Sequence, residues 1–350
     1  MLVLLVGQTP RRFGPDNFQW LNDTAQGLRR LGHTVRTVSY RDSVVESPLL
    51  RNALLRMPAL SHRLSGYGDG LRRTYERRLV MLARRLRPDL VIVLKGEILS
   101  GETLSEVKRL ARGPVVTWWV DDPWRYPSCL QQMTLFDHVF IFDRSYMPRL
   151  AAAGVSRVHF LPCGCNDLVY RPLRLNHTAQ RRFACDVSFV AWGYPGRSEV
   201  VQALAREVDL GVWGGGWNGL RWQRTVRGHA VIRGPSVSSR TAVKIYNASK
   251  IGLNVHQAQS RSGGLNTRTF ELPASGLFQI VDRVGGLEEL LAPGVEVVCY
   301  GSPEEARELA RRYLADESAR THMARRARAR VLEEHTYLCR MRTLCEVARG

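Results

Sequence analysis

Two glycines followed by an arginine and a glutamate form the stretch of this sequence that is best suited to chemistry. Gly263 and Gly264 precede a short amphipathic segment that carries Arg268 and Glu271. A glycine-rich turn at a helix start exposes backbone N–H groups and the positive end of the helix dipole, which attract anions. The guanidinium of Arg268 fits phosphate oxygens. We therefore expect the segment 262–282 to hold a phosphate-bearing ligand, with Glu271 as the nearby carboxylate.

The charge around this segment favours the same chemistry. No Asp or Glu occurs between Leu210 and Phe270. Clustered cations without carboxylates create a field suited to a polyanionic ligand, although an arginine-rich surface formed by chance is the alternative. The cations of the span are Arg221, Arg224, Arg227, Arg233, Arg240, Lys244, Lys250, Arg261 and Arg268.

The whole chain is strongly basic. It has 350 residues and a formal net charge of +19, and only four of its 51 basic residues are lysine. Such a surface attracts nucleic acid, anionic lipid or phosphorylated substrates. The length allows two domains of ordinary size.

Cysteine usage and hydropathy favour a cytoplasmic protein. The seven cysteines are scattered, and the only close pair, Cys163 and Cys165, does not have zinc-knuckle spacing. An odd number without a framework indicates reduced thiols. The apolar N-terminus lacks a basic region and is too short for a signal peptide or membrane span, so we interpret it as a buried strand.

Alternating strands and helices predict two doubly wound βα domains, each with a parallel sheet covered on both faces. The first domain is expected at 1–165 and the second at 185–334. A polar linker, 166–184, separates them, and a final amphipathic helix covers 335–350. Expected strands are Leu2–Val6, Thr34–Val38, Asp89–Leu94, Val115–Val120, Phe136–Phe142, Val158–Leu161, Val187–Ala191, Val208–Trp213 and Ile251–His256.

Ligands of such sheets bind at the carboxyl ends of the strands, so the strand-end residues are the candidates. Two domains that face each other would form a cleft there. In the first domain the candidates are Gly7, Arg11 in the following loop, Lys95, Glu97, Asp121 and Asp122. In the second domain they are Gly193, Gly214, His256 and Asp282, and Trp213 beside Gly214 is a further candidate for donor binding. We expect Lys250, together with Arg268 and the helix N-terminus, to stabilise the charge of a leaving diphosphate.

Asp121 and Asp122 end a strand between tryptophans 118, 119 and 124. A carboxylate in an aromatic pocket can have a raised pKa and act as a general base. The alternative is a helix cap or turn stabiliser before Pro123. Both interpretations stay open from the sequence.

Other chemistries find less support. The spacing of Gly214, Gly216 and Gly219 matches a dinucleotide fingerprint, but the expected acidic residue about twenty positions later is missing. This argues against a nicotinamide-dependent dehydrogenase. Trp213 and Trp217 could stack on a base or pack in the core. No catalytic triad and no His/Cys metal cluster stands out, and no Asp-x-Asp motif predicts a metal-bridged diphosphate.

Two longer stretches resemble a known family. They are Tyr246–His256 and Gly264–Gly276, the second of which reads Gly-Leu-Asn-Thr-Arg-Thr-Phe-Glu-Leu-Pro-Ala-Ser-Gly. These stretches resemble glycosyltransferases of the CgeB (spore maturation) type, which are relatives of the group-1 glycosyltransferases with the GT-B fold. Segments 286–290, 331–337, 89–96 and 119–123 also match, so the resemblance covers almost the whole chain.

The resemblance implies a GT-B fold, with a nucleotide-sugar donor in the second domain and an acceptor mainly on the first. Glu271 would match the ribose-binding carboxylate, and Arg268 and Asn266 would lie at the diphosphate. The related group has a paired-glutamate motif, and Gly263 occupies its first position. The final helix would cross back onto the first domain.

We therefore expect a metal-independent glycosyltransferase that needs no cofactor and uses a UDP- or GDP-linked sugar. Its acceptor is open, and a peripheral contact with an anionic membrane is kept as an option, whereas specific nucleic-acid binding is not expected. Asp121 or Asp122 would be the base of an inverting reaction. The alternative is a non-catalytic protein that binds nucleotide, nucleic acid or anionic membrane through its arginine-rich surface.

Overall fold

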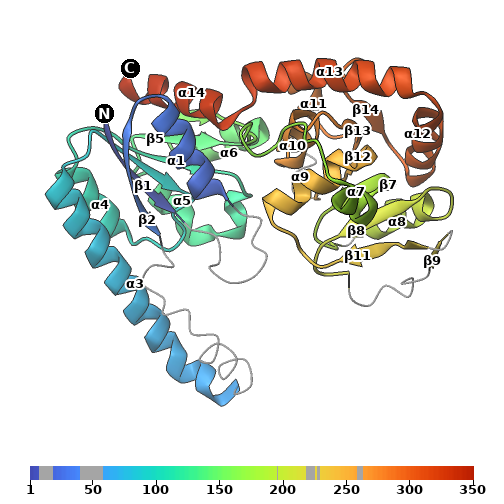
Figure 1. Cartoon of the computed structure of the whole chain (residues 1–350). Coiled ribbons are helices and arrows are strands. Elements are labelled where there is room, and N and C mark those ends of the chain that lie inside the picture. The colour runs from blue at the N-terminus through green and yellow to red at the C-terminus, as the bar shows by residue number, and fades with distance from the viewer. Residues whose placement is uncertain (8–18, 40–57, 195, 218–224, 227–228, 258–262) are drawn as a thin grey trace. The chain divides into compact units, whose positions relative to one another are not determined.

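The computed structural model describes residues 1–7, 19–39, 58–194, 196–217, 225–226, 229–257 and 263–350. These residues form two compact units. The first unit contains the described residues up to Pro162 together with Arg340–Gly350, and the second contains Cys163–Cys339. Each unit is built around its own parallel sheet, as the alternating pattern predicts (Figure 1).

The sheet of the first unit has six strands in the order β2-β1-β3-β4-β5-β6, and all its pairings are parallel. β1, β3, β4 and β5 are apolar and buried along nearly their whole length, as expected for parallel strands that are covered on both faces. The strands are β1 (Leu2–Gly7), β2 (Thr34–Ser39), β3 (Leu90–Leu94), β4 (Val115–Trp119), β5 (His138–Ile141) and β6 (Val158–Phe160).

The helices of this unit fill the crossovers. Ser100 begins α4 because its side chain accepts from the backbone N–H of Thr103. α3 and α4 pack against each other, and Figure 1 shows that α3 extends well beyond the sheet. The helices are α1 (Trp20–Arg30), α3 (Pro58–Leu86), α4 (Gly101–Leu110), α5 (Pro127–Met133) and α6 (Met147–Ala152), with 3₁₀ turns Pro123–Arg125 and Arg144–Tyr146.

The sheet of the second unit also has six parallel strands, in the order β11-β8-β7-β12-β13-β14. In chain order this is the 3-2-1-4-5-6 arrangement of doubly wound nucleotide-binding folds. The strands are β7 (Cys185–Val190), β8 (Leu210–Trp213), β11 (Ile232–Gly234), β12 (Ser249–Asn254), β13 (Phe278–Asp282) and β14 (Val298–Tyr300). β9 (Thr225–Val226) and β10 (His229–Ala230) form a separate two-stranded antiparallel sheet.

α8 and α12 pack together and share a buried apolar core with β7, β8, β12 and β13. α12 starts after Ser302, whose Oγ accepts from the backbone N–H of Glu305 at 3.1 Å. The helices of this unit are α7 (His177–Phe183), α8 (Arg197–Ala205), α9 (Ser239–Asn247), α10 (Arg268–Ala274), α11 (Leu287–Leu290), α12 (Pro303–Ala315) and α13 (Glu317–Glu334).

Two segments differ from the sequence-based expectation. The sequence predicts a helix over Leu71–Leu86 with a strongly basic face, but α3 starts at Pro58. Segment 166–184 is not a bare linker, since it contains α7, and the Asn247 side chain accepts from the Leu173 N–H at 2.7 Å and donates to the Arg171 carbonyl at 3.0 Å. Much of the expected linker is therefore bound to the second unit.

The last helix, α14 (Tyr337–Arg349), begins in the second unit, and its residues from Arg340 onward belong to the first. Arg340 Nε donates to the carbonyl of Pro162 at 2.9 Å, and Met341 and Leu344 are fully buried. No helix in the described part of the chain is long and apolar enough to cross a lipid bilayer.

Candidate functional site

The second sheet reverses its strand order between β7 and β12, and the carboxyl ends of these two strands are where doubly wound folds bind ligands. Two arginines converge there. Arg268, at the start of α10, donates through Nε to the carbonyl of Val190 at 2.9 Å and through Nη1 to Asn254 Oδ1 at 3.2 Å. These contacts fix the partly exposed guanidinium of Arg268 across the ends of both strands.

Arg197, the second arginine, was missed in the sequence. It is the first residue of α8 and is 4% exposed. Its Nη1 donates to the carbonyl of Trp192 at 2.7 Å and its Nη2 to that of Val255 at 2.8 Å, so it ties the loop after β7 to the end of β12. No local pattern of the sequence singles out Arg197.

Neither guanidinium forms a salt bridge with a carboxylate among the described residues. Their hydrogen bonds of 2.7–3.2 Å go to neutral carbonyl and amide oxygens. Burial and the positive charge of Arg268 lower the pKa of Arg197 to about 9. A buried cation without a counter-ion is costly, so this place favours an anion.

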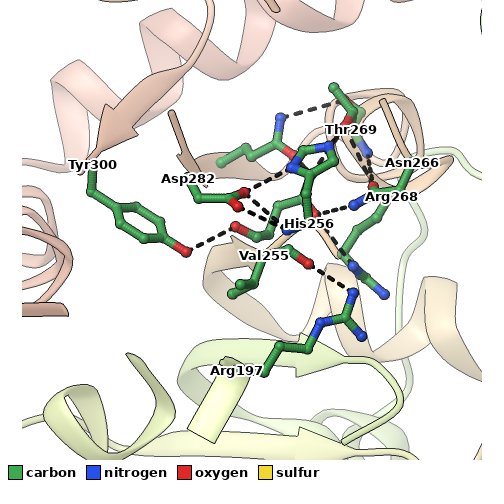
Figure 2. A network of polar contacts seen from close by, with 10 residues as sticks. Arg197, Val255, His256, Asn266, Arg268, Thr269, Asp282 and Tyr300 are labelled. Atoms are coloured by element: carbon green, nitrogen blue, oxygen red, sulfur yellow. Dashed lines mark hydrogen bonds and ion pairs between the residues drawn. The ribbon is translucent and has the colours of Figure 1, made fainter. Parts of the chain in front are cut away.

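A chain of hydrogen bonds behind the arginines connects β12, β13 and α10 (Figure 2). Asp282 accepts from the backbone N–H of His256 at 3.0 Å, and its Oδ1 lies 2.7 Å from His256 Nδ1. His256 Nε2 lies 3.2 Å from the hydroxyl of Thr269, which also accepts from Asn254 Nδ2 at 3.0 Å. Both ring nitrogens of His256 are thus used inside the protein, and its side chain is fully buried. The structure therefore gives His256 a positioning role in place of the expected ligand contact.

Asn266 belongs to the same network. Its Nδ2 donates to Asn254 Oδ1 at 2.9 Å, and its Oδ1 accepts from the backbone N–H of Thr269 at 3.1 Å. The start of α10 is therefore capped by the protein itself, and α10 has only seven residues. The expected open helix N-terminus is wrong, although Gly263 and buried Gly264 lead directly into this turn.

Glu271 lies one turn after Arg268 and is partly buried. Burial raises the pKa of its carboxyl group, while the charge of Arg268 and hydrogen bonds with Thr267 and Tyr170 act in the opposite direction. The hydroxyl of Tyr246, stacked on Tyr170 at 6.2 Å between ring centroids, bonds with Arg268. The predicted pair, Arg268 and Glu271, is thus held in one polar cluster.

The glycines after β7 and β8 allow two loops to touch. A Cβ on Gly193 would lie 2.6 Å from the carbonyl oxygen of Gly216, and one on Gly214 would lie 1.7 Å from that of Ala191. Trp213 and Trp217 are buried and pack edge-on against Phe183 and Phe189, which makes them core residues rather than base-stacking groups.

Exposed aromatic side chains follow β7 directly. Trp192 is 52% exposed, and its indole lies over the glycine turn, because a Cβ on Gly216 would come within 2.3 Å of Trp192 Nε1. The ring of Tyr194, 40% exposed, lies 5.2 Å from the guanidinium carbon of Arg197. Neither residue was predicted from the sequence.

Two cations of the carboxylate-free span are paired with acids from outside it. Lys250 donates to Asp186 Oδ1 at 2.8 Å from the amino-terminal end of β12, opposite the end that carries His256. Arg233 pairs with Asp209. The expected role of Lys250 at the donor is therefore wrong, and the basic field is weaker than the sequence suggested. Arg221, Arg224, Arg227 and Arg261 lie outside the described residues.

In the first unit the predicted strand-end residues also meet. Lys95 Nζ donates to the Tyr126 hydroxyl at 2.7 Å and to Asp121 Oδ2 at 3.1 Å, and lies 3.7 Å from Glu97 Oε1. Burial lowers the pKa of Lys95, but the hydrogen bond to Tyr126 and the charges of Glu97 and Asp121 outweigh this and raise it. Glu97 Oε2 is buried without a protein partner among the described residues.

The two aspartates have different tasks. Asp122 Oδ1 accepts from the backbone N–H of Trp124 and caps the turn that begins at Pro123, which is the alternative that the sequence left open. Asp121 contacts Lys95, Tyr126 and Arg125, so it lies in a charged cluster rather than an aromatic pocket. Its role as a base stays a prediction.

The remaining candidates of the first unit contribute less. Gly7 ends β1 and is buried. A Cβ at this position would meet Leu21 and Leu94 at 3.1–3.2 Å, so the glycine allows these side chains to pack against the strand. Arg11 lies outside the described residues. No group of three or more His, Cys, Asp or Glu side chains suited to a metal ion occurs in the part of the chain that the structure describes.

Sequence comparison finds a family model that matches most of the second unit. Residues 197–346 match the family model described as "glycosyl transferase-like". The chain is also similar to the spore protein CgeB of Bacillus subtilis (strain 168), with 20% identity over 215 residues, which cover 58% of this chain and 66% of that protein. The match therefore spans slightly less than two thirds of the length of that curated relative.

Structural comparison shows that the chain has the GT-B fold. Anabaena HepE in complex with UDP-glucose is 14% identical, with a TM-score of 0.63 over 99% of this chain and 98% of that chain. The sucrose-phosphate synthase of Thermosynechococcus elongatus is 14% identical, with a TM-score of 0.68 over the same shares. The chain thus has the GT-B fold, and residues 197–346 are similar to the glycosyl transferase-like family model.

Proposed function

We propose that the protein transfers a sugar from a nucleoside-diphosphate sugar to an acceptor, and that the donor's diphosphate binds at Arg268. The observation that carries this proposal is the pair of guanidiniums at the reversal of strand order, Arg197 and Arg268, without a carboxylate in salt-bridge contact among the described residues. Arg268 would contact the phosphates directly, and the positive charge of buried Arg197 would attract them from inside the protein.

The neighbouring groups suit the other parts of such a donor. Glu271, one helical turn from Arg268, would accept hydrogen bonds from ribose hydroxyls, as the family resemblance implies. Exposed Trp192 and Tyr194 offer flat surfaces beside Arg197 for a nucleobase or sugar ring. UDP and UDP-glucose are the ligands in the HepE structures, which makes UDP the first nucleotide to test.

The first unit would supply the acceptor side. Among the described residues Glu97 Oε2 has no protein partner, so it would accept a hydrogen bond from an acceptor hydroxyl. Lys95 holds Glu97 and Asp121 in one cluster. Charge on the leaving diphosphate would be stabilised by the two arginines, without a metal ion or other cofactor.

Calorimetric titration of the full chain with UDP, GDP, inorganic pyrophosphate and uridine, with EDTA present, tests the donor site. We expect the diphosphates to bind saturably and uridine to bind far more weakly. Arg268→Ala should weaken UDP binding at least tenfold, since charged hydrogen bonds contribute about 1.5–3 kcal/mol each. Hydrolysis of UDP-sugars and GDP-sugars in the same buffer would then identify the donor.

Arg240→Ala is the matched control, because Arg240 is exposed on α9 within the same basic span. It should leave UDP affinity unchanged. The proposal fails if no nucleoside diphosphate binds, or if Arg240→Ala weakens UDP binding as much as Arg268→Ala does, because a diffuse basic surface would explain that result.

A further inference from the structure

Arginine is concentrated on the second half of α3 and at Arg87, the residue that follows the helix. Seven of the sixteen residues 72–87 are arginine, against 47 of 350 in the whole chain. All seven are exposed. They are Arg72, Arg73, Arg77, Arg78, Arg84, Arg85 and Arg87.

The same helix segment has almost no negative charge on its exposed face. Its single acidic residue, Glu76, is buried, and its Oε1 accepts from the backbone N–H of Ser100 at 2.6 Å. Tyr75 and Leu79 are buried beside it. From the neighbouring α4, Glu106 reaches Arg84 at 3.4 Å, but it also binds Arg109 of its own helix at 2.7 Å. The exposed face of α3 therefore keeps a strong positive charge.

An apolar side chain lies in the middle of this charge. Met81 is 65% exposed, which is the highest value among the large apolar side chains of the described residues. Its neighbours three and four positions away on the helix surface are all arginines. They are Arg77, Arg78, Arg84 and Arg85.

We propose that this face of α3 binds the surface of a lipid bilayer that contains anionic phospholipids. The guanidiniums would contact lipid phosphates, while Met81 would enter the boundary between headgroups and acyl chains. An apolar tip within a basic face fits a bilayer better than a nucleic acid, since a phosphate backbone offers no apolar surface to Met81. The surface is independent of the donor site, which lies in the second unit.

Vesicle co-sedimentation of the full chain tests this surface. We expect binding to phosphatidylcholine vesicles that contain phosphatidylglycerol, little binding to phosphatidylcholine alone, and loss of binding at high salt. Arg77→Glu with Arg85→Glu should reduce the partition coefficient more than tenfold, because each basic residue near an anionic surface contributes about fivefold. Met81→Asp should also reduce it, whereas Met81→Leu should not. These substitutions are on exposed positions, and thermal melts would check the fold.

The matched control reverses the same charge elsewhere. Arg325 and Arg326 are exposed on α13 in the second unit, and Arg325→Glu with Arg326→Glu should leave vesicle binding unchanged. An equal loss in both double variants would overturn the proposal, because binding would then follow net charge alone. Wild-type vesicle binding by Met81→Asp, or a preference for single-stranded RNA over the vesicles, would also overturn it.

Discussion

At the scale of single residues, the two arginines of the second unit differ in how far the sequence predicts them. Arg268 could be predicted, because a glycine pair precedes it and Glu271 follows one turn later. Arg197 could not, because its importance comes from burial and from bonds to the carbonyls of Trp192 and Val255, which are 5 and 58 positions away in the sequence. Long-range contacts of this kind leave no local pattern.

The surroundings of the two aspartates in the first unit also could not be predicted from their neighbours in the sequence. Their tryptophan neighbours suggested an aromatic pocket, but Trp118 is buried against Trp20 and donates to the carbonyl of Leu161. Adjacent residues of a strand point to opposite faces, so neighbours in sequence need not surround one another. The contacts of Asp121 come instead from the ends of other elements.

Glu271 gives a prediction at this scale. Burial raises the pKa of the Glu271 carboxyl group above its value in the unfolded chain. Above the ordinary carboxyl range the folded protein therefore binds more protons than the unfolded chain does. The ionised carboxylate thus lowers the free energy of unfolding at neutral pH. Glu271→Gln should therefore raise the melting temperature of the ligand-free protein at pH 7, with a smaller gain below pH 4.5. The same variant should bind UDP about tenfold more weakly, since an amide is a weaker acceptor for ribose hydroxyls.

Differential scanning calorimetry across pH and titration with UDP would measure both effects. Glu271→Asp keeps the charge and serves as the control for stability. A lower melting temperature for Glu271→Gln together with wild-type UDP affinity would contradict both parts, and would assign Glu271 a purely structural role.

At the scale of elements, the strands were the most predictable part and α3 the least. Continuous apolar runs identified the central strands of both sheets, because buried parallel strands contact apolar helices on both faces. The start of α3 was missed because three glycines at 66, 68 and 70 and an irregular apolar pattern argue against a helix, although Pro58 suits a first turn. Local propensity is a weak guide when the surrounding structure decides.

The contact between α10 and β12 gives a second prediction, and it concerns Thr269. Its hydroxyl accepts from Asn254 Nδ2 and lies 3.2 Å from His256 Nε2. Thr269→Val keeps the volume but leaves buried polar groups without this partner, which should cost about 1–3 kcal/mol of unfolding free energy. Urea denaturation would measure the loss. Thr269→Ser restores the hydroxyl and should recover most of it.

A larger loss of UDP affinity in Thr269→Val than in Thr269→Ser is also expected, since the same network orients Asn254 against Arg268. Equal stability of the two variants would show that the hydroxyl contributes nothing to holding α10 on the sheet.

At the scale of the whole molecule, the last residues of the chain belong to the first unit. Met341, Leu344 and Cys345 are buried in α14, and Arg340 donates to the Pro162 carbonyl. Burial of a Leu or Met side chain contributes about 1.5–3 kcal/mol, so the loss of this segment would remove a large part of the 5–15 kcal/mol that stabilises an ordinary domain. The amphipathic pattern predicted this helix. Because residues from both ends of the sequence belong to the first unit, one cleavage of the chain cannot separate the two units.

Truncation after Cys339 should therefore unfold the first unit and spare the second. All residues proposed to hold the donor lie between Trp192 and Asp282, inside the second unit. We expect the truncated chain to lose one of two calorimetric transitions, to keep a transition that UDP shifts upward, and to bind UDP within about threefold of the full chain while losing all transfer activity. Removal of residues 349 and 350 alone is the control and should change neither transition. Loss of UDP binding on truncation after Cys339 would mean that the donor site needs the first unit, which contradicts its placement at Arg197 and Arg268 alone.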